Sequence, residues 1–338
     1  MAVYTQRKEI EDFASAHALH LALGYFDGVH LGHQALLEKV LQLSEERGGE
    51  PGVLLLEPHP QRVLGGNEGL GSLNTLEEKI RIIRRFGDIH IFILTFDRDF
   101  AALSPEAFAR DYLAGLLRAR TAVCGYNYRF GHKGGGNSRD LERLGLAYGF
   151  ACSILPQVTA GGKPVSSTGI RKLIESGDMY EAYFRLGHGH IYEGNVVGGR
   201  KLGTRLGFPT ANLELDGGLL WPAYGVYGGF IRDGEGRIHR GVVNAGIRPT
   251  VNQEGGAPSF EVYLTDYEGD LYGDRLQAAL TDRLRPEKAF GSVEELKEQI
   301  SLDTISAAAA LDEWEKKLAD TGGSPASIFT CFLRSNQL

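Results

Sequence analysis

The fold of the first half of the chain is decided by one stretch near its start, Leu23-Gly24-Tyr25-Phe26-Asp27-Gly28-Val29-His30-Leu31-Gly32-His33. Apolar residues lead into it from Leu19, as in a buried parallel strand. After it, apolar residues recur at helical spacing from Leu36 to Leu43. The stretch therefore predicts a tight turn from a strand into a helix.

This turn has the features of a phosphate-binding site. Its glycines let the backbone approach a ligand closely, and a helix start presents unpaired N–H groups and a positive dipole end. His30 and His33 are three residues apart, so they can lie side by side at the helix entry. A glycine turn before a helix is also common without a ligand, and two such histidines also suit a surface pair or half a metal site. The spacing leaves these alternatives open.

Length and composition restrict the class of protein. The chain has 338 residues, which favours two domains, and 42% hydrophobic with 23% charged residues is ordinary for a globular protein. A net charge of −7 argues against general nucleic-acid binding. We expect a cytoplasmic protein without a membrane partner, because no run approaches the roughly 20 apolar residues of a membrane span. The chain has three cysteines, Cys124, Cys152 and Cys331, and we expect all three to be reduced thiols.

Strands and helices alternate in the first half. Apolar segments predict strands ending at Leu23 and over Gly52–Leu56, Ile89–Phe96, Thr121–Cys124 and Ala151–Val158. Helical patterns lie between and after them, over Thr75–Phe86, Ser104–Leu117, Leu141–Tyr148 and Ile170–Arg185, the last broken at Ser176-Gly177-Asp178. This alternation predicts an α/β, Rossmann-like domain with a parallel sheet covered by helices. Its ligands should bind at the carboxyl ends of the strands, where the His30/His33 turn and the His59 loop lie.

Two further segments of the first half carry polar groups suited to a nucleotide. The loop 125–136 combines glycines, aromatic rings, the Asn127 amide and cations. Ser166-Ser167-Thr168 precedes a helix that contains Arg171, a permanent cation with five donors. A flexible surface loop and plain helix capping are the alternative interpretations.

Together these segments resemble the motifs of bacterial FMN adenylyltransferases. Gly24–His33 is similar to their form of the His-x-Gly-His signature, 125–131 to Gly-x-[Asp/Asn]-[Phe/Tyr]-x-Phe-Gly, and 166–171 to Ser-Ser-Thr-x-Ile-Arg. The resemblance implies that the two histidines stabilise charge on the leaving pyrophosphate. One departure is Leu55-Leu56, where family members often have Thr-Phe; we expect altered packing there. The implied ATP site comprises Gly24, Phe26, Asp27, Gly28, His30, Gly32, His33, Asn127, Ser166, Ser167, Thr168 and Arg171.

The pattern changes near residues 183–187, which predicts domains over 1–183 and 184–338. Short β-rich runs follow, separated by glycine and proline turns, and they indicate a mainly antiparallel barrel or sandwich. Asp233-Gly234-Glu235-Gly236 predicts a hairpin turn. Two C-terminal helices are expected, Val293–Ile300 and about Ile305–Asp320.

The segment Gly194–Asn212 is the chemical centre of the second half. It lacks the Gly-Lys-[Ser/Thr] of a Walker A loop, yet its glycines and cations suit phosphate. Thr210 and Asn212 offer two neutral oxygen ligands for one Mg²⁺. A basic hairpin followed by a proline turn is the alternative.

Gly207-Phe208-Pro209-Thr210-Ala211-Asn212 resembles the Gly-x-Pro-Thr-Ala-Asn signature of riboflavin kinases, and segments at 225–227, 244–250, 260–262 and 270–273 match in order. The resemblance implies that Thr210 and Asn212 bind Mg²⁺ and ATP phosphate. It makes Glu261 the general base for the ribityl 5′-hydroxyl. Tyr263, where many members have His, is expected to be peripheral. The implied ATP and flavin site comprises Gly198, Arg200, Lys201, Gly203, Gly207, Pro209, Thr210, Asn212, Asn244 and Glu261.

The two resemblances cover about residues 15–183 and 184–318, in the order of bacterial bifunctional flavin-synthesising enzymes. They imply phosphorylation of riboflavin to FMN and adenylylation of FMN to FAD, both with ATP and Mg²⁺. We expect a monomer or weak homo-oligomer. Three alternatives stay open: a different acceptor for the nucleotide, a chain with only one active site, and a flavin-binding sensor without turnover.

Overall fold

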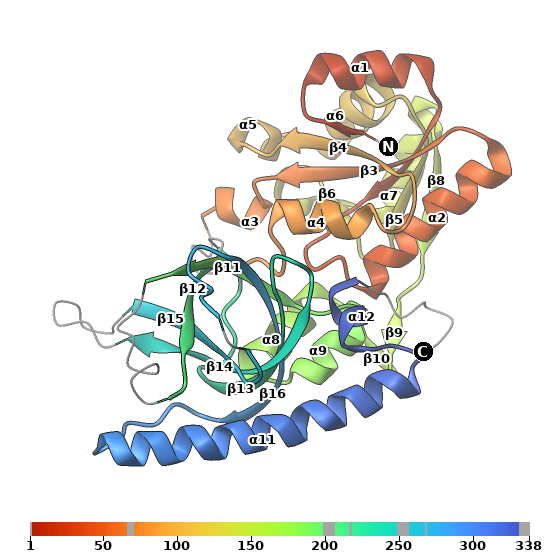
Figure 1. Ribbon diagram of the computed structural model, residues 1–338. Helices are drawn as coiled ribbons and strands as arrows, with labels where there is room; N and C mark the ends of the chain where they lie inside the picture. The colour runs from red at the N-terminus through yellow and green to blue at the C-terminus, as the bar shows by residue number, and fades with distance from the viewer. Residues whose placement is uncertain are drawn as a thin grey trace. The chain divides into compact units, whose positions relative to one another are not determined.

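The computed structural model describes residues 2–65, 71–198, 207–215, 218–248, 257–267 and 269–330 (Figure 1). The chain forms two compact units. One comprises Met1–Leu70 and Leu76–Ser166, and the other comprises Gly71–Thr75 and Ser167–Leu338. Contacts thus group α8 (Ser167–Ser176) and α9 (Met179–Leu186) with the second unit. The domain boundary at 183/184 stays a prediction.

The first unit is built on a six-stranded sheet in the order β1-β4-β3-β2-β5-β8, and every neighbouring pair is parallel. This confirms the predicted fold class. The strands are β1 (Val3–Tyr4), β2 (Leu19–Leu23), β3 (Glu50–Glu57), β4 (His90–Thr95), β5 (Ala119–Gly125) and β8 (Ala151–Leu155). The short edge strand β1 and the first helix, α1 (Arg7–Ala16), were not predicted.

Helices cover the sheet, as the alternating pattern requires (Figure 1). Ser104 caps the expected helix after β4, which begins as α6 (Pro105–Ala107) and continues as a π-helix, Phe108–Leu116. Asn137 caps α7 (Ser138–Tyr148) through the N–H groups of residues 139 and 140. The remaining helices are α2 (Leu31–Arg47), α3 (Pro60–Val63), α4 (Leu76–Ile83) and α5 (Arg98–Ala101).

The central strand β2 determines where a ligand can bind. It pairs with β3 on one side and β5 on the other, and all five of its residues are buried, as expected for a central strand of a parallel sheet covered by helices on both faces. The chain builds β3 and β4 on one side of β2 and later adds β5 and β8 on the opposite side. Such a change of direction opens a crevice at the carboxyl ends of the strands. The loops after β2, β3 and β5 start at this edge.

The second unit contains a closed six-stranded barrel in the order β11-β12-β15-β14-β13-β16 (Figure 1). Neighbouring strands are antiparallel, as predicted, and closure leaves no free sheet edge. The predicted turn at Asp233–Gly236 joins β13 to β14. The strands are β11 (Ile191–Val197), β12 (Thr210–Leu215), β13 (Gly225–Arg232), β14 (Ile238–Arg248), β15 (Ala257–Leu264) and β16 (Arg275–Arg285).

One prediction for the C-terminal helices is wrong. A single helix, α11, runs from Val293 to Asp320, where the sequence pattern indicated two. The segment 301–304 contains no glycine or proline to end the helix, and Asp303 within it is buried against Arg285. A short helix, α12 (Pro325–Thr330), follows. In the described part of the chain, no helix combines the length and apolar character that a bilayer crossing requires.

Candidate active sites

The turn between β2 and α2 has an unusual backbone. Phe26, Gly28 and Val29 have φ angles of 51°, 83° and 37°, in the left-handed region that side chains other than glycine rarely adopt. Phe26 and Val29 are fully buried, so packing holds them in this conformation. Strain of this kind persists only where the surroundings enforce it, and it is frequent at functional sites.

The turn presents a stacked pair of imidazoles at the start of α2. The rings of His30 and His33 are 3.8 Å apart between centroids and inclined by 11°. The backbone N–H of His33 donates to Nδ1 of His30 at 3.4 Å, which makes His30 the cap of the helix. A side chain at Gly32 would place its Cβ 3.1 Å from the His30 ring. The glycine therefore leaves room for this stack.

The environment of His33 favours its neutral form. Burial of the ring lowers the pKa of His33 well below its usual 6.5, and the neighbouring His30 and the Lys79 ammonium lower it further. Its Nδ1 atom is buried and has no hydrogen-bond partner among the described residues. A ligand with a polar group can therefore pair with this atom.

Lys79 and Glu57 belong to the same region and were missed in the sequence. Lys79, on α4, is only 4% exposed, and its Nζ lies 4.0 Å from Oε2 of Glu57 at the end of β3. A lysine on a helix usually faces solvent. The signal that indicates its burial is the spacing to Ile82 and Ile83, which lie one turn later on the same face.

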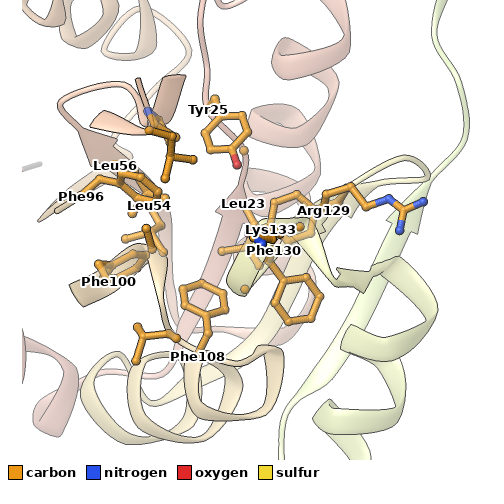
Figure 2. A pocket seen from close by; sticks show the side chains of 18 residues that line it. Leu23, Tyr25, Leu54, Leu56, Phe96, Phe100, Phe108, Arg129, Phe130 and Lys133 are labelled. Carbon is orange, nitrogen blue, oxygen red and sulfur yellow. The ribbon is translucent and has the colours of Figure 1, made fainter. Parts of the chain in front are cut away.

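An apolar cavity of about 120 Å³ opens at the same edge of the sheet. Figure 2 shows the side chains of Phe100, Phe108 and Phe130 around this space. Leu56, one of the two residues that depart from the family pattern, also lines it, so the departure changes the cavity wall. The other lining residues include Leu23, Gly24, Tyr25, Leu54, Phe96, Tyr128, Arg129 and Lys133.

The remaining residues expected in the ATP site are divided between the units. Asn127 is exposed on the loop that follows β5, the strand next to β2. Ser166 is the last residue of the first unit. Ser167 and Thr168 begin α8 in the second unit. Arg171 is buried there, and its Nε donates to the carbonyl of Gly71 at 3.3 Å.

A second cavity, of about 210 Å³, lies in the barrel unit and is lined by Thr210, Asn244 and Glu261. Glu261 on β15 is paired in register with Asn212 on β12 and with Asn244 on β14. Directly opposed residues share one face of a sheet, so the three polar side chains form a row. Tyr263 was expected to be peripheral, but it lines this cavity. It lies two residues after Glu261 and therefore on the same face of the strand.

Thr210 and Asn212 fit a divalent cation. They alternate with Ala211 along β12, so their side chains share one face. Oδ1 of Asn212 is buried and has no hydrogen-bond partner among the described residues. Oxygen donors of this kind suit Mg²⁺, which binds one or two protein groups and completes its shell with phosphate and water. The described residues contain no cluster of three or more His, Cys, Asp or Glu side chains suited to a metal.

Some predicted residues cannot be placed. Arg200, Lys201 and Gly203 lie outside the described residues, as do Pro249 and Thr250. Gly198 follows the end of β11. Gly207 has a φ of +91° and, with Pro209, immediately precedes β12.

Comparisons with known proteins match both halves. The FAD synthetase family model matches residues 12–169, and the riboflavin kinase model matches residues 186–311. The bifunctional riboflavin kinase/FMN adenylyltransferase of Bacillus subtilis (strain 168) is 36% identical over 287 residues, 84% of this chain and 89% of the relative. The protein of the same description from Escherichia coli (strain K12) is 36% identical, covering 85% and 91%. A crystal structure described as a macrolide-efflux protein from Streptococcus pneumoniae has a TM-score of 0.81 and 28% identity, covering 91% and 99%.

Proposed function

The chain belongs to the family of bifunctional riboflavin kinase/FMN adenylyltransferases, and on this premise we propose which residues carry the two reactions. Its first part is an FAD synthetase module and its second part a riboflavin kinase module. The kinase converts riboflavin and ATP to FMN and ADP. The synthetase transfers AMP from ATP to FMN, which gives FAD and pyrophosphate. The observation that carries our residue assignment is that each unit has its own cavity beside its own polar residues.

In the first unit, the start of α2 holds the phosphates of ATP. His30 and His33 are fixed by their stacking and by the capping bond, so they need no rearrangement to meet the charge that develops on pyrophosphate. The helix N-terminus adds further positive potential. By resemblance to the family motifs, Asn127 and Ser166 of the same unit are further ATP ligands, and the assignment of Ser167, Thr168 and Arg171 to ATP stays a prediction from the sequence motif.

The flavin ring of FMN binds in the aromatic cavity at the same sheet edge. A planar, largely apolar ring system suits a space bounded by Phe100, Phe108 and Phe130, because aromatic rings bury large areas and stack. The phosphate of FMN is then the nucleophile. The protein positions two substrates and forms no covalent intermediate in this proposal.

In the second unit, Glu261 takes the proton from the 5′-hydroxyl of riboflavin. It lines the cavity and lies between two amide side chains, Asn212 and Asn244, on the neighbouring strands. A carboxylate within hydrogen-bond reach of an alcohol is suited to this step. Mg²⁺, when bound with ATP by Thr210 and Asn212, neutralises phosphate charge.

The protein is proposed to act in the cytoplasm as a monomer or weak homo-oligomer. Cys124 and Cys152 are free, and burial raises the pKa of their thiols to about 12 and about 11, which fits reduced, unreactive cysteines.

The proposal is tested by separating flavins chromatographically after incubation with riboflavin, ATP and Mg²⁺. We expect FMN first and FAD later, and neither when a chelator removes the metal. Absence of FMN would contradict the kinase site, and FMN without FAD would contradict the adenylyl-transfer site. Sedimentation of the purified chain tests the oligomeric state.

A further inference from the structure

The aromatic cavity of the first unit carries positive charge in its wall. Among the described residues, its lining contains two cations, Arg129 and Lys133, and no Asp or Glu. In Figure 2 the guanidinium of Arg129 extends away from the aromatic rings, whereas the Lys133 side chain ends among the labelled side chains. A pocket with apolar walls and a few polar groups suits an amphipathic ligand. Lys133 is therefore placed to meet the charged end of such a ligand.

The loop that carries Lys133 packs tightly against the start of α6. Gly131 has a φ of +73°, and a Cβ at this residue would lie 2.6 Å from the backbone nitrogen of Pro105. The next residue, His132, donates its backbone N–H to the carbonyl of Leu103 at 2.6 Å. The loop is thus anchored to the wall of the cavity, although its glycines alone would suit a flexible surface loop.

The backbone of Lys133 is itself unusual. Its φ of 50° and ψ of 28° lie in the left-handed region, which glycine adopts without cost and lysine rarely adopts. Its ammonium has no hydrogen-bond or ion-pair partner among the described residues. Strained residues of this kind are frequent where a ligand is clamped. The contacts within the fold do not explain a lysine here, whereas an anionic ligand does.

Resting on the adenylyl-transfer function proposed above, we propose that Lys133 binds the phosphate group of FMN and so selects FMN over riboflavin. The flavin ring occupies the aromatic cavity, and the phosphate carries about two negative charges near pH 7. The lysine ammonium has three donors, and its hydrogen bonds to phosphate oxygens are charge-assisted. Riboflavin has a neutral hydroxyl in place of the phosphate and gains much less from this lysine.

Kinetics of FAD formation from FMN separate this proposal from the alternative of a lysine that only contacts solvent. Lys133→Met should raise the KM for FMN about tenfold and leave the KM for ATP within about twofold. Lys133→Arg, which keeps the charge, should recover most of the loss. Lys8→Met, at an exposed lysine on α1 of the same unit, is the matched control and should behave as the parent. An unchanged KM for FMN in Lys133→Met would overturn the proposal.

The dependence on salt distinguishes a charge contact from a change of shape. Added KCl should raise the KM for FMN in the parent, because salt screens the attraction between ammonium and phosphate. Lys133→Met should lose most of this dependence. A variant with a raised KM that keeps the full salt dependence of the parent would overturn the proposal.

Lys133→Gly separates binding from folding. Glycine removes the charge and relieves the left-handed backbone, so the variant should be at least as stable as the parent in urea unfolding. It should nevertheless show the same tenfold rise in the KM for FMN. A parental KM for FMN in Lys133→Gly would overturn the proposal, and this variant decides if Lys133→Met does not fold.

Calorimetric titration with FMN and with riboflavin needs no turnover. Lys133→Met should weaken one FMN-binding event about tenfold and leave the riboflavin isotherm unchanged, because riboflavin has no phosphate. Equal weakening of both flavins would overturn the proposal, since it would locate the contact at the ring. If the parent makes no FAD from FMN, the proposed function fails by itself, and the titration still decides the role of Lys133.

Discussion

Asn212, Glu261 and Asn244 form a row of polar side chains across three strands of the barrel wall. Asn212 is 7% exposed and its Oδ1 has no partner among the described residues. A buried polar atom without a hydrogen bond costs about 1–3 kcal/mol of stability. The unpartnered Oδ1 of Asn212 is therefore poorly explained by folding alone and supports our proposal that this face of the barrel binds a cation and phosphate.

Replacing the central residue of this row should remove one activity only. Glu261→Gln should lower the rate of riboflavin phosphorylation by about 100-fold or more, because the amide cannot accept the hydroxyl proton. FMN adenylylation by the same protein should remain at the parental rate. Both rates are measured by flavin chromatography. Glu214→Gln, at an exposed position of β12, is the control; equal loss of kinase activity there would argue against a specific role for Glu261.

The side-chain carboxylate of Asp233 stabilises the hairpin between β13 and β14. Asp233 accepts hydrogen bonds from the backbone N–H groups of Glu235 and Arg237, from Nε of Arg237 at 2.9 Å and from Nε2 of His239 at 2.8 Å. Burial alone would raise the pKa of Asp233, but the bonds from His239 and Arg237 outweigh it and lower the pKa to about 2. The folded state thus prefers the ionised carboxylate.

This preference predicts how stability depends on pH. Because the pKa of Asp233 is lower in the folded than in the unfolded state, its contribution is present above about pH 4 and is lost as the pH falls towards 2. Asp233→Asn should cost about 2 kcal/mol at pH 7 and flatten the acid dependence. Urea unfolding, followed by the fluorescence of Trp221 and Trp314, measures this. Exposed Asp266→Asn should change neither quantity, and identical acid profiles for both variants would contradict the assignment.

Ion pairs of two barrel arginines, Arg285 and Arg240, attach α11 to the barrel, and they differ in burial. Arg285 binds Asp303 through two contacts of 2.8 and 2.7 Å, and the Asp303 side chain is 6% exposed. Arg240 binds both Asp312 at 2.7 Å and Glu315 at 2.9 Å, and the Asp312 side chain is 59% exposed. Both aspartates lie on the same helix and bind an arginine, but neutralising Asp312 leaves Arg240 its second partner, Glu315.

Breaking the buried pair should be much more costly. Asp303→Asn should destabilise the second unit by about 3 kcal/mol, because it leaves Arg285 without its counter-charge. Asp312→Asn should cost about 0.5 kcal/mol, since solvent screens the exposed pair. Urea unfolding by tryptophan fluorescence gives both values. Equal losses for the two variants would show that burial does not decide the contribution of these pairs.

At the scale of the whole molecule, each unit has its own cavity and its own polar residues. The chemical product of the kinase reaction is the acceptor in the adenylyl transfer. No residue of one cavity lining is shared with the other. The two reactions should therefore be separable in different molecules of the same chain.

A mixing experiment tests this separation. His30→Ala combined with His33→Ala should abolish FAD formation and leave riboflavin phosphorylation intact, the reverse of Glu261→Gln. Mixed in one solution with riboflavin, ATP and Mg²⁺, the two variants should produce FAD, because FMN released by one can bind the other. Loss of both activities in either folded variant would contradict two independent sites.

Local sequence signals were sufficient for most of the fold, and the resemblance to known families identified the motifs. Apolar runs and helical spacing indicated the strands from β2 onwards in the sheet and the antiparallel nature of the second half. The residue types and spacings of the His30 turn and the Thr210 segment suit phosphate and a cation, whereas Glu261 was identified only through the resemblance to riboflavin kinases. The edge strand β1, only two residues long, carries too little pattern to be recognised.

The tertiary structure decided what depends on neighbours distant in the sequence. A lysine at position 79 resembles any solvated helical residue until the packing of α4 buries it beside His33. Within α11, Asp303 meets Arg285 from β16, and Tyr263 of β15 lines the same cavity as Arg285. The sequence by itself thus determined which chemical groups are present and in what order. Folding determined their burial and mutual distances, and these control charge states and the strength of contacts.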